Sequence, residues 1–270
     1  MFSPEIAFDE DTVIEVDMPD RLSDLSNCVA TSDQMGGNAA ECNRDSIRFE
    51  NAFSGSTTAG AAFTLKVGTG TNGESVRDQG TLTIKAYLEI DDVEYTVAEY
   101  SGVSTFVPTA GSINSASVTP ASFVTYAANT LYTFSLNPKH KVETGFVQVT
   151  FPNSDFIIKD SSVNYDCKFK TEVPRSCAID DESVRLELDS DMEITASTAN
   201  AFSFEGIRNP RTTEPVSGFT FTTYDADGYV IDTGTSSTSL TMTTLAEADH
   251  FQAEYVNATN GAVTSILFSL

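Results

Sequence analysis

The hexapeptide FVQVTF, residues 146–151, decides the fold, because from Val147 onward its apolar side chains alternate with polar ones. Successive side chains of a strand point to opposite faces, so this pattern buries one face and leaves the other in water. The same two-residue period recurs in SVRLEL (183–188), AFSFEGI (201–207), GFTFTTYD (218–225), IEVDM (14–18), SIRFE (46–50), AAFTLKV (61–67) and GTLTIKAYLEI (80–90). No window of about 11 residues or more keeps a helical stripe. Many short strands without crossover helices predict an all-β protein of antiparallel sandwiches.

Length and charge limit the classes of function. A chain of 270 residues is long enough for two ordinary domains, each with its own core. The net charge of −24 would repel phosphates, so we expect no nucleic-acid partner. No apolar run approaches the roughly 18 residues of a membrane helix, and no secretory signal precedes Phe2. A secreted protein shown without its signal would have this composition, and so would a fragment.

A repeat of about 134 residues runs through the chain. The segments that recur in the same order are IEVDMP (14–19) with VQVTFP (147–152), AAFTLKV (61–67) with NAFSFEG (200–206), TLTIKAY (81–87) with FTFTTY (219–224), and LYTFSL (131–136) with SILFSL (265–270). A pair of cysteines follows the first segment in both places. So many matches in one order indicate a duplication, and the small drift in spacing is what loop insertions produce.

The phase of this repeat predicts three units. Residues 1–112 form a repeat that lacks its first strands, residues 113–249 form a complete repeat, and residues 250–270 are the opening strands of a following repeat. We expect the last unit to complete the first domain of the next copy by strand complementation. The side chains expected at that interface are Phe251, Tyr255, Leu267, Leu270, Ile14 and Val16. Those expected to point into the core of the complete repeat are Phe134, Val147, Val149, Phe151, Phe202, Phe204, Phe219 and Phe221.

The four cysteines form two local pairs at matching places in the two repeats. An even count and a shared position favour two disulfides, Cys28–Cys42 and Cys167–Cys177, and hence an oxidising compartment. The alternative is a zinc site, but the chain contains no Cys-x₂-Cys motif and a four-ligand site would need a second pair nearby.

Acidic clusters raise the question of calcium. The tetrapeptide DADG (225–228) could offer oxygen ligands from Asp225 and Asp227, but the residues after it lack the glutamate that closes an EF-hand loop. Asp and Gly also supply the geometry of a hairpin turn, which is the simpler interpretation. Calcium is therefore a weak hypothesis, and we expect no other cofactor.

Asn257 belongs to the tripeptide NAT, the sole sequon for N-glycosylation, and is a candidate site for glycan in a secreted chain. Catalysis has little support. His140 and His250 have no Ser or Cys nucleophile motif beside them, and VGTGTNG (67–73) lacks the lysine of a phosphate-binding loop. We therefore expect that the protein is not an enzyme.

One part of the sequence resembles a known family. SVTPASF…TLYTFSLNP…GFVQVTFP (117–152), followed by FEGIRNPRTTEPVSGFTFTTYDADGYVID (204–232), is similar to the tandem immunoglobulin-like repeats of giant secreted or surface proteins of ciliates and other protists. The resemblance covers most of residues 113–234 and weakens in the first repeat, where VGTGTNG stands in place of GIRNP. It implies a structural or adhesive extracellular role and no enzymatic activity.

These observations predict tandem immunoglobulin-like, antiparallel β-sandwich domains in a repeat array. The predicted function is that of a structural subunit or segment of an extracellular filament or cell-surface coat, in which identical copies are joined head-to-tail. The alternative is an adhesin-type module whose loops bind a glycan or a protein. An image of purified material would discriminate the two, because regular filaments favour the first and dispersed short rods with ligand affinity favour the second.

Overall fold

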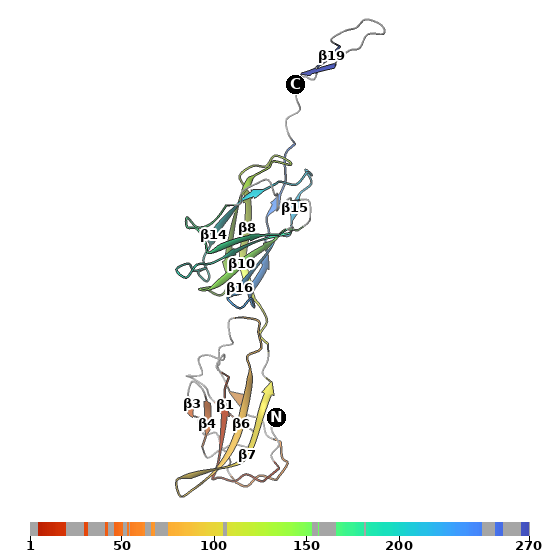
Figure 1. The fold of residues 1–270 in the computed structure, drawn as a ribbon. Helices are drawn as coiled ribbons and strands as arrows, with labels where there is room; N and C mark the ends of the chain where they lie inside the picture. The colour runs from red at the N-terminus through yellow and green to blue at the C-terminus, as the bar shows by residue number, and fades with distance from the viewer. Residues whose placement is uncertain are drawn as a thin grey trace.

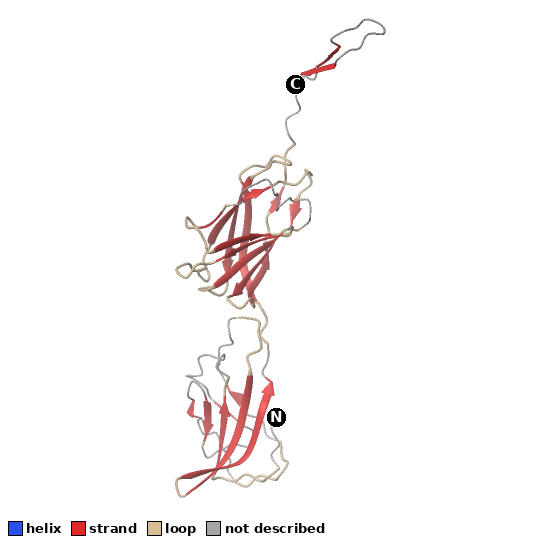
Figure 2. Ribbon diagram, viewed as in Figure 1, coloured by secondary structure: helices blue, strands red, loops and turns tan. Residues whose placement is uncertain are grey.

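The chain is an all-β protein in the parts that the structure describes (Figure 2). The structure is a computed structural model that describes residues 5–19, 46–50, 53, 55–62, 75–104, 107–152, 156, 166–180 and 182–244, together with the backbones of five short strands at 30–31, 41–42, 66–67, 252–255 and 266–269. Within these ranges there is no helix, and so none that could cross a membrane. The predicted all-β fold class is confirmed.

The second domain contains one continuous hydrogen-bonded sheet of nine strands, in the order β11-β14-β9-β8-β17-β16-β10-β13-β12. In chain order these strands are β8 (Gly111–Pro120), β9 (Thr130–Pro138), β10 (Gly145–Thr150), β11 (Cys167–Phe169), β12 (Ser176–Ile179), β13 (Ser183–Glu187), β14 (Asn200–Ile207), β16 (Thr220–Asp225) and β17 (Val230–Thr235). A separate small pair joins β15 (Val216–Ser217) to β18 (Ser239–Leu240).

Strand β8 divides this sheet into two layers. Its first residues, Gly111 and Ser112, pair in parallel with β17, and its later residues pair antiparallel with β9. The register shifts between Ile113 and Ser115, where the strand passes from one layer to the other. A strand that changes sheets at a bulge makes the corner of a sandwich. The parallel contact was not expected from the sequence, which predicted antiparallel neighbours throughout.

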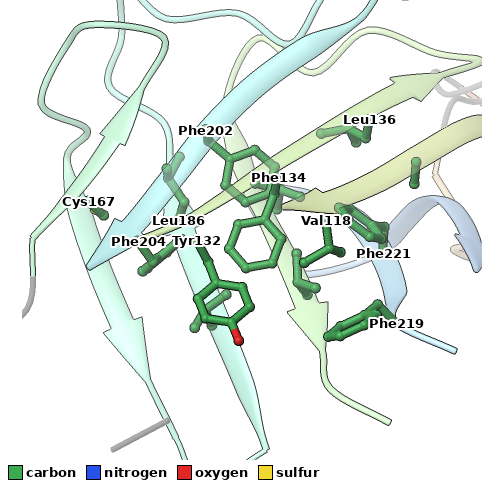
Figure 3. Packing of buried hydrophobic residues seen from close by; sticks show 14 of the residues in the cluster. Val118, Tyr132, Phe134, Leu136, Cys167, Leu186, Phe202, Phe204, Phe219 and Phe221 are labelled. Carbon is green, nitrogen blue, oxygen red and sulfur yellow. The ribbon is translucent and has the colours of Figure 1, made fainter. Parts of the chain in front are cut away.

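The core lies between the two layers and is rich in phenylalanine (Figure 3). All eight side chains predicted to point inward are buried, each with at most 4% of its surface exposed, so this prediction is confirmed. Phe134 of β9 stacks on Phe202 of the same layer at 5.2 Å and meets Phe221 of the opposite layer edge-on at 6.2 Å between ring centroids. The aromatic rings therefore join the layers through offset and edge-to-face contacts.

The first domain is built on a five-stranded sheet in the order β3-β4-β1-β6-β7. Its strands are β1 (Thr12–Asp17), β3 (Glu41–Cys42), β4 (Ser46–Phe49), β6 (Thr81–Ile90) and β7 (Val93–Ser104); β2 (Ala30–Thr31) and β5 (Lys66–Val67) form a separate pair. The five strands pair in the same order as β12-β13-β10-β16-β17 of the second domain. Ile14 lies between Phe49 and Ala86, just as Val147 lies between Leu186 and Thr223.

The two sheets differ at one edge. In the second domain β17 has β16 on one side and β8 on the other, whereas the described first sheet ends at β7. Near the C-terminus, β19 (Gln252–Tyr255) and β20 (Ile266–Ser269) form an antiparallel pair of their own. A sheet edge with unpaired backbone groups is a template for another strand.

Candidate functional site

The two domains meet end to end through the segment that precedes β6 (Figure 1). The backbone N–H of Val76 donates to the carbonyl of Val230 at 2.6 Å. The Nη1 of Arg77 lies 2.9 Å from Oδ2 of Asp227, and its guanidinium carbon lies 5.6 Å from the centre of the Tyr229 ring. We call this contact the joint. It places an arginine of the first domain on the turn between β16 and β17 of the second.

The turn that receives Arg77 is held in shape by Asp225. Its Oδ1 accepts hydrogen bonds from the backbone N–H groups of Asp227 and Tyr229, at 3.1 and 2.9 Å. Gly228 has a φ of 88°, which glycine adopts without strain. The interpretation of DADG as a hairpin turn is therefore confirmed. Both weak calcium candidates, Asp225 and Asp227, instead face Arg77, and no group of three or more potential metal ligands occurs among the described residues.

A buried carboxylate fixes the chain where it passes into the second domain. Asp232 is fully buried, and its two oxygens accept hydrogen bonds from the backbone N–H of His140 and contact Nδ1 of the same residue, both at 2.8 Å. Gly111 lies against this pair so closely that a Cβ there would overlap the Asp232 carboxylate. His140 is thus engaged in a structural contact, and the first residues of β8 are held beside β17.

Asn209 organises the opposite end of the second domain. Its side chain is fully buried, accepts a hydrogen bond from the hydroxyl of Tyr132 at 2.6 Å, and donates to the carbonyls of Ser122 and Val124 at 2.8 and 2.9 Å. Its backbone N–H donates to the carbonyl of Ala127. This one amide therefore holds the loop between β8 and β9 in place, which gives the Asn-Pro step of GIRNP a structural role.

The loop held by Asn209 and the arginines on either side of Asn209 together present a cationic and aromatic surface. Arg208 and Arg211 lie over the ring of Tyr126, with their guanidinium carbons 4.6 and 4.4 Å from its centre. Arg211 also donates to the Tyr126 hydroxyl at 2.8 Å, and this hydrogen bond lowers the pKa of the phenol. Tyr126 and the nearby Phe123 are 37% and 44% exposed. We call this surface the arginine end. No pattern in the sequence predicted this surface, although the two arginines flank the Asn-Pro step.

The β6–β7 turn lies at the end of the first domain away from the joint (Figure 1), and the surface around it is acidic. A hollow of about 510 Å³ opens there. Its lining residues are Glu10, Asp11, Val13, Glu50, Glu89, Asp91 and Asp92. Asp91 and Asp92, at φ values of 53° and 61°, form the two-residue turn between β6 and β7, as primed hairpin turns require. We call this surface the acidic end.

The disulfide between Cys167 and Cys177 joins β11 to β12. These strands are the two ends of the nine-stranded order, so the bond closes the side of the sandwich opposite β8. Cys28 and the side chain of Cys42 lie outside the described residues, and the second predicted pair stays a prediction.

The residues predicted for strand complementation fall into two groups. Ile14 and Val16 are at most 6% exposed and are buried by their own domain, in a cluster with Phe8, Ile47 and Phe49. They were predicted to lie at the interface with the next copy, whereas the structure buries them within their own domain: β1 is a central strand, and the described sheet ends at β3 and β7. Tyr255 and Leu267 belong to β19 and β20, of which the backbone alone is described. Phe251, Leu270 and the sequon residue Asn257 lie outside the described residues.

Comparisons with known proteins give distant structural likenesses and no family. No family model matches the sequence, and no curated protein matches it. The C-terminal domain of the Streptococcus pyogenes antigen I/II-family protein AspA is similar at 8% identity and a TM-score of 0.31, over 85% of each chain. The C-terminal domain of the Streptococcus agalactiae AgI/II polypeptide BspA gives 9% and 0.31, over 86% of this chain and 85% of that one.

A third solved structure is BslA, a bacterial hydrophobin, at 15% identity and a TM-score of 0.28, over 48% of this chain and 96% of that one. Likenesses this distant carry no argument about function. The resemblance to protist repeats stays a prediction.

Proposed function

We propose that the chain is a structural subunit or segment of an extracellular filament or cell-surface coat, built head-to-tail from β-sandwich domains and without catalytic activity. One observation carries the proposal: the first domain has the strand order of the second as far as β7 and then lacks neighbours equivalent to β8 and β9 among its described strands. A second copy of the chain could supply them.

The pair formed by β19 and β20 has the pattern of the missing strands. Phe268 of β20 lies opposite Ala253 of β19, as Phe134 of β9 lies opposite Val118 of β8. The sequence match of SILFSL with LYTFSL aligns the same two phenylalanines. In the proposed assembly, β19 pairs with β7 of the next copy as β8 pairs with β17.

Strand β7, at the edge of the described sheet, also exposes apolar side chains. Tyr95 and Tyr100 on this strand are 53% and 58% exposed, and Val93 is 49% exposed. Exposed apolar side chains on one contiguous strand mark an interaction surface. Insertion of a strand from another chain would cover this edge and satisfy its backbone groups. Such a contact is heterologous and does not close, so it extends into a filament.

The disulfide supports the extracellular part of the proposal. Cys167 and Cys177 are bonded across the open side of the sandwich. Structural disulfides persist in secreted and surface proteins and are rare in reducing compartments. A net charge of −24 would also keep a repetitive β protein soluble outside its assembly.

The proposal is tested by deletion of residues 251–270. The full chain should form filaments in negative-stain images, and the deleted chain should not. Addition of a synthetic peptide of residues 251–270 should raise the melting temperature of the first domain in the deleted chain, whereas a peptide of the same composition in scrambled order should leave it unchanged. Filaments that persist after the deletion would contradict the proposal.

A further inference from the structure

The joint between the two domains consists of two halves, one from each domain. One half is the segment before β6, which carries Arg77; the other is the turn after β16, which carries Asp227 and Tyr229. Because the strand orders match, β6 corresponds to β16, so every domain of this kind has one such segment and one such turn at opposite ends. The joint uses the segment of the first domain and the turn of the second. The other segment and the other turn lie at the two outer ends of the two-domain unit.

The outer segment is the connection that precedes β16, and it forms the arginine end. Arg208 and Arg211 lie in it as Arg77 lies in the connection that precedes β6. Arg211 is exposed and lies over the ring of Tyr126 from its own domain, whereas in the joint the ring under Arg77 is Tyr229 of the opposite half. A guanidinium held on an aromatic ring is already oriented for a carboxylate, so less side-chain freedom is lost when it binds.

The outer turn joins β6 to β7 and belongs to the acidic end. Asp91 and Asp92 form it, and six carboxylate side chains but no basic ones line the hollow around it. Ile90 and Val93, which pair across the base of the turn, are 55% and 49% exposed. The acidic end therefore offers carboxylates flanked by apolar side chains, and the arginine end offers guanidinium groups flanked by Tyr126 and Phe123. The two surfaces are complementary in charge and in apolar character.

We propose that the arginine end of one copy binds the β6–β7 turn of a second copy, with Arg211 and Arg208 on the carboxylates of Asp91, Asp92 and Glu89. This contact rests on the proposed head-to-tail function and adds its recognition element. It repeats between chains the pairing of an arginine with a turn carboxylate that Arg77 and Asp227 make in the joint, and it sets which end of a copy meets which. In a chain with 39 acidic and 15 basic residues, most other end-to-end contacts would place like charges together.

Charge exchange tests the contact. Arg211→Glu should weaken assembly of the full chain roughly 10-fold in critical concentration by sedimentation, since it places a carboxylate against an acidic surface. The paired change Glu10→Lys with Glu89→Lys at the acidic end should weaken assembly to a similar extent. The chain that carries all three changes should recover assembly close to that of the unmodified chain. Arg175→Glu, an equal charge change at an exposed site away from both ends, serves as the matched control.

The outcomes separate this contact from the proposed function. Filaments that form equally well with Arg211→Glu, or a triple variant that is not rescued, would overturn the contact while leaving strand complementation intact. Loss of assembly on deletion of residues 251–270 tests complementation independently of charge. If Arg211→Glu instead abolishes retention on a sulfated oligosaccharide resin and leaves assembly unchanged, the arginine end binds a glycan and the proposal is wrong. Circular dichroism of each variant checks that it remains folded.

Discussion

Arg77 of the first domain and Asp227 of the second lie 2.9 Å apart, 150 residues apart in the sequence. Together with the Val76–Val230 hydrogen bond, this ion pair joins the two domains into an extended unit (Figure 1). The buried side chain of Gln79 supports the arrangement, because its Nε2 donates to the carbonyl of Arg77. A rigid joint would make the spacing of successive domains regular, as a filament requires.

Arg77→Glu should loosen the joint. The change places a carboxylate against Asp227 and removes the contact with Tyr229, yet the pair is partly exposed, so the cost in unfolding free energy should be only about 0.2–1 kcal/mol. The larger effect should be on geometry. Small-angle scattering should show a broader distribution of interdomain distances. Arg77→Lys keeps the charge without the planar group, so its distribution should be broader than that of the unmodified chain and narrower than that of Arg77→Glu. An unchanged distribution would mean that other contacts fix the domains.

Removal of the Cys167–Cys177 disulfide should destabilise the second domain. The bond closes a loop of 10 residues in sequence separation, so the chain-entropy model gives a loss of roughly 3 kcal/mol on replacement of both cysteines by serine. Calorimetry should show the loss in the transition of the second domain alone.

Peptide mapping without reduction should link Cys167 to Cys177 and Cys28 to Cys42. A link between the two repeats, or four free thiols, would contradict both the pairing and the extracellular assignment. The same digest would show whether Asn257 carries a glycan.

Phe134→Ala should be among the most damaging single changes in the second domain. The ring is fully buried and contacts Phe202, Phe204 and Phe221, so truncation leaves a cavity between the layers and should cost about 3–5 kcal/mol. Phe134→Leu fills part of that space and should cost less. Urea denaturation measures both, and equal losses for the two variants would show that the cavity is not the cause.

Asn209→Ala should loosen the arginine end without unfolding the sandwich. It leaves the buried Tyr132 hydroxyl and the carbonyls of Ser122 and Val124 without this partner, at about 1–3 kcal/mol. The double variant with Tyr132→Phe should be less destabilised than the two single losses combined, because the hydroxyl left unpaired by the first change is then absent. Additive losses would mean that Asn209 and Tyr132 act independently. Hydrogen exchange should rise in residues 121–129.

Stability should fall at alkaline pH through Tyr132. Burial raises the pKa of its phenol above the ordinary value of about 10, so the folded domain keeps it neutral where the unfolded chain ionises. The unfolded state then binds fewer protons, and the free energy of unfolding decreases as the pH rises through about 10. Tyr132→Phe should remove this part of the decrease. Denaturant midpoints measured between about pH 8 and 11 provide the comparison, and parallel curves for the two proteins would refute it.

The sequence by itself determined strands such as β10 and β16 and their inward faces, and it indicated a correspondence of the two halves that agrees with their matching strand orders. It did not determine all of them: of AAFTLKV, Ala61 and Ala62 lie outside any strand, and β7 was not predicted. Alternation of apolar and polar residues is a local property, so FVQVTF and GFTFTTYD indicated that Val149 and Phe221 face inward without knowledge of their partner strands. The core prediction succeeded for that reason. The DADG turn was likewise predictable, because Asp and Gly set the backbone geometry within four residues.

The tertiary structure alone decided which strand edges meet. The parallel pairing of β8 with β17 depends on a bulge at Ile113–Ser115. The alternation of apolar and polar residues around Ile14 is the same whether its strand is central in a sheet or at the edge. This is why Ile14 and Val16 were assigned to the interface with the next copy, although they are buried in a cluster with Ile47, Phe49 and Ala86 of their own domain. The Arg77–Asp227 joint and the Tyr126 surface join residues that are far apart along the chain. Contacts of this kind are set by the packing of whole domains, which residue periodicity does not encode.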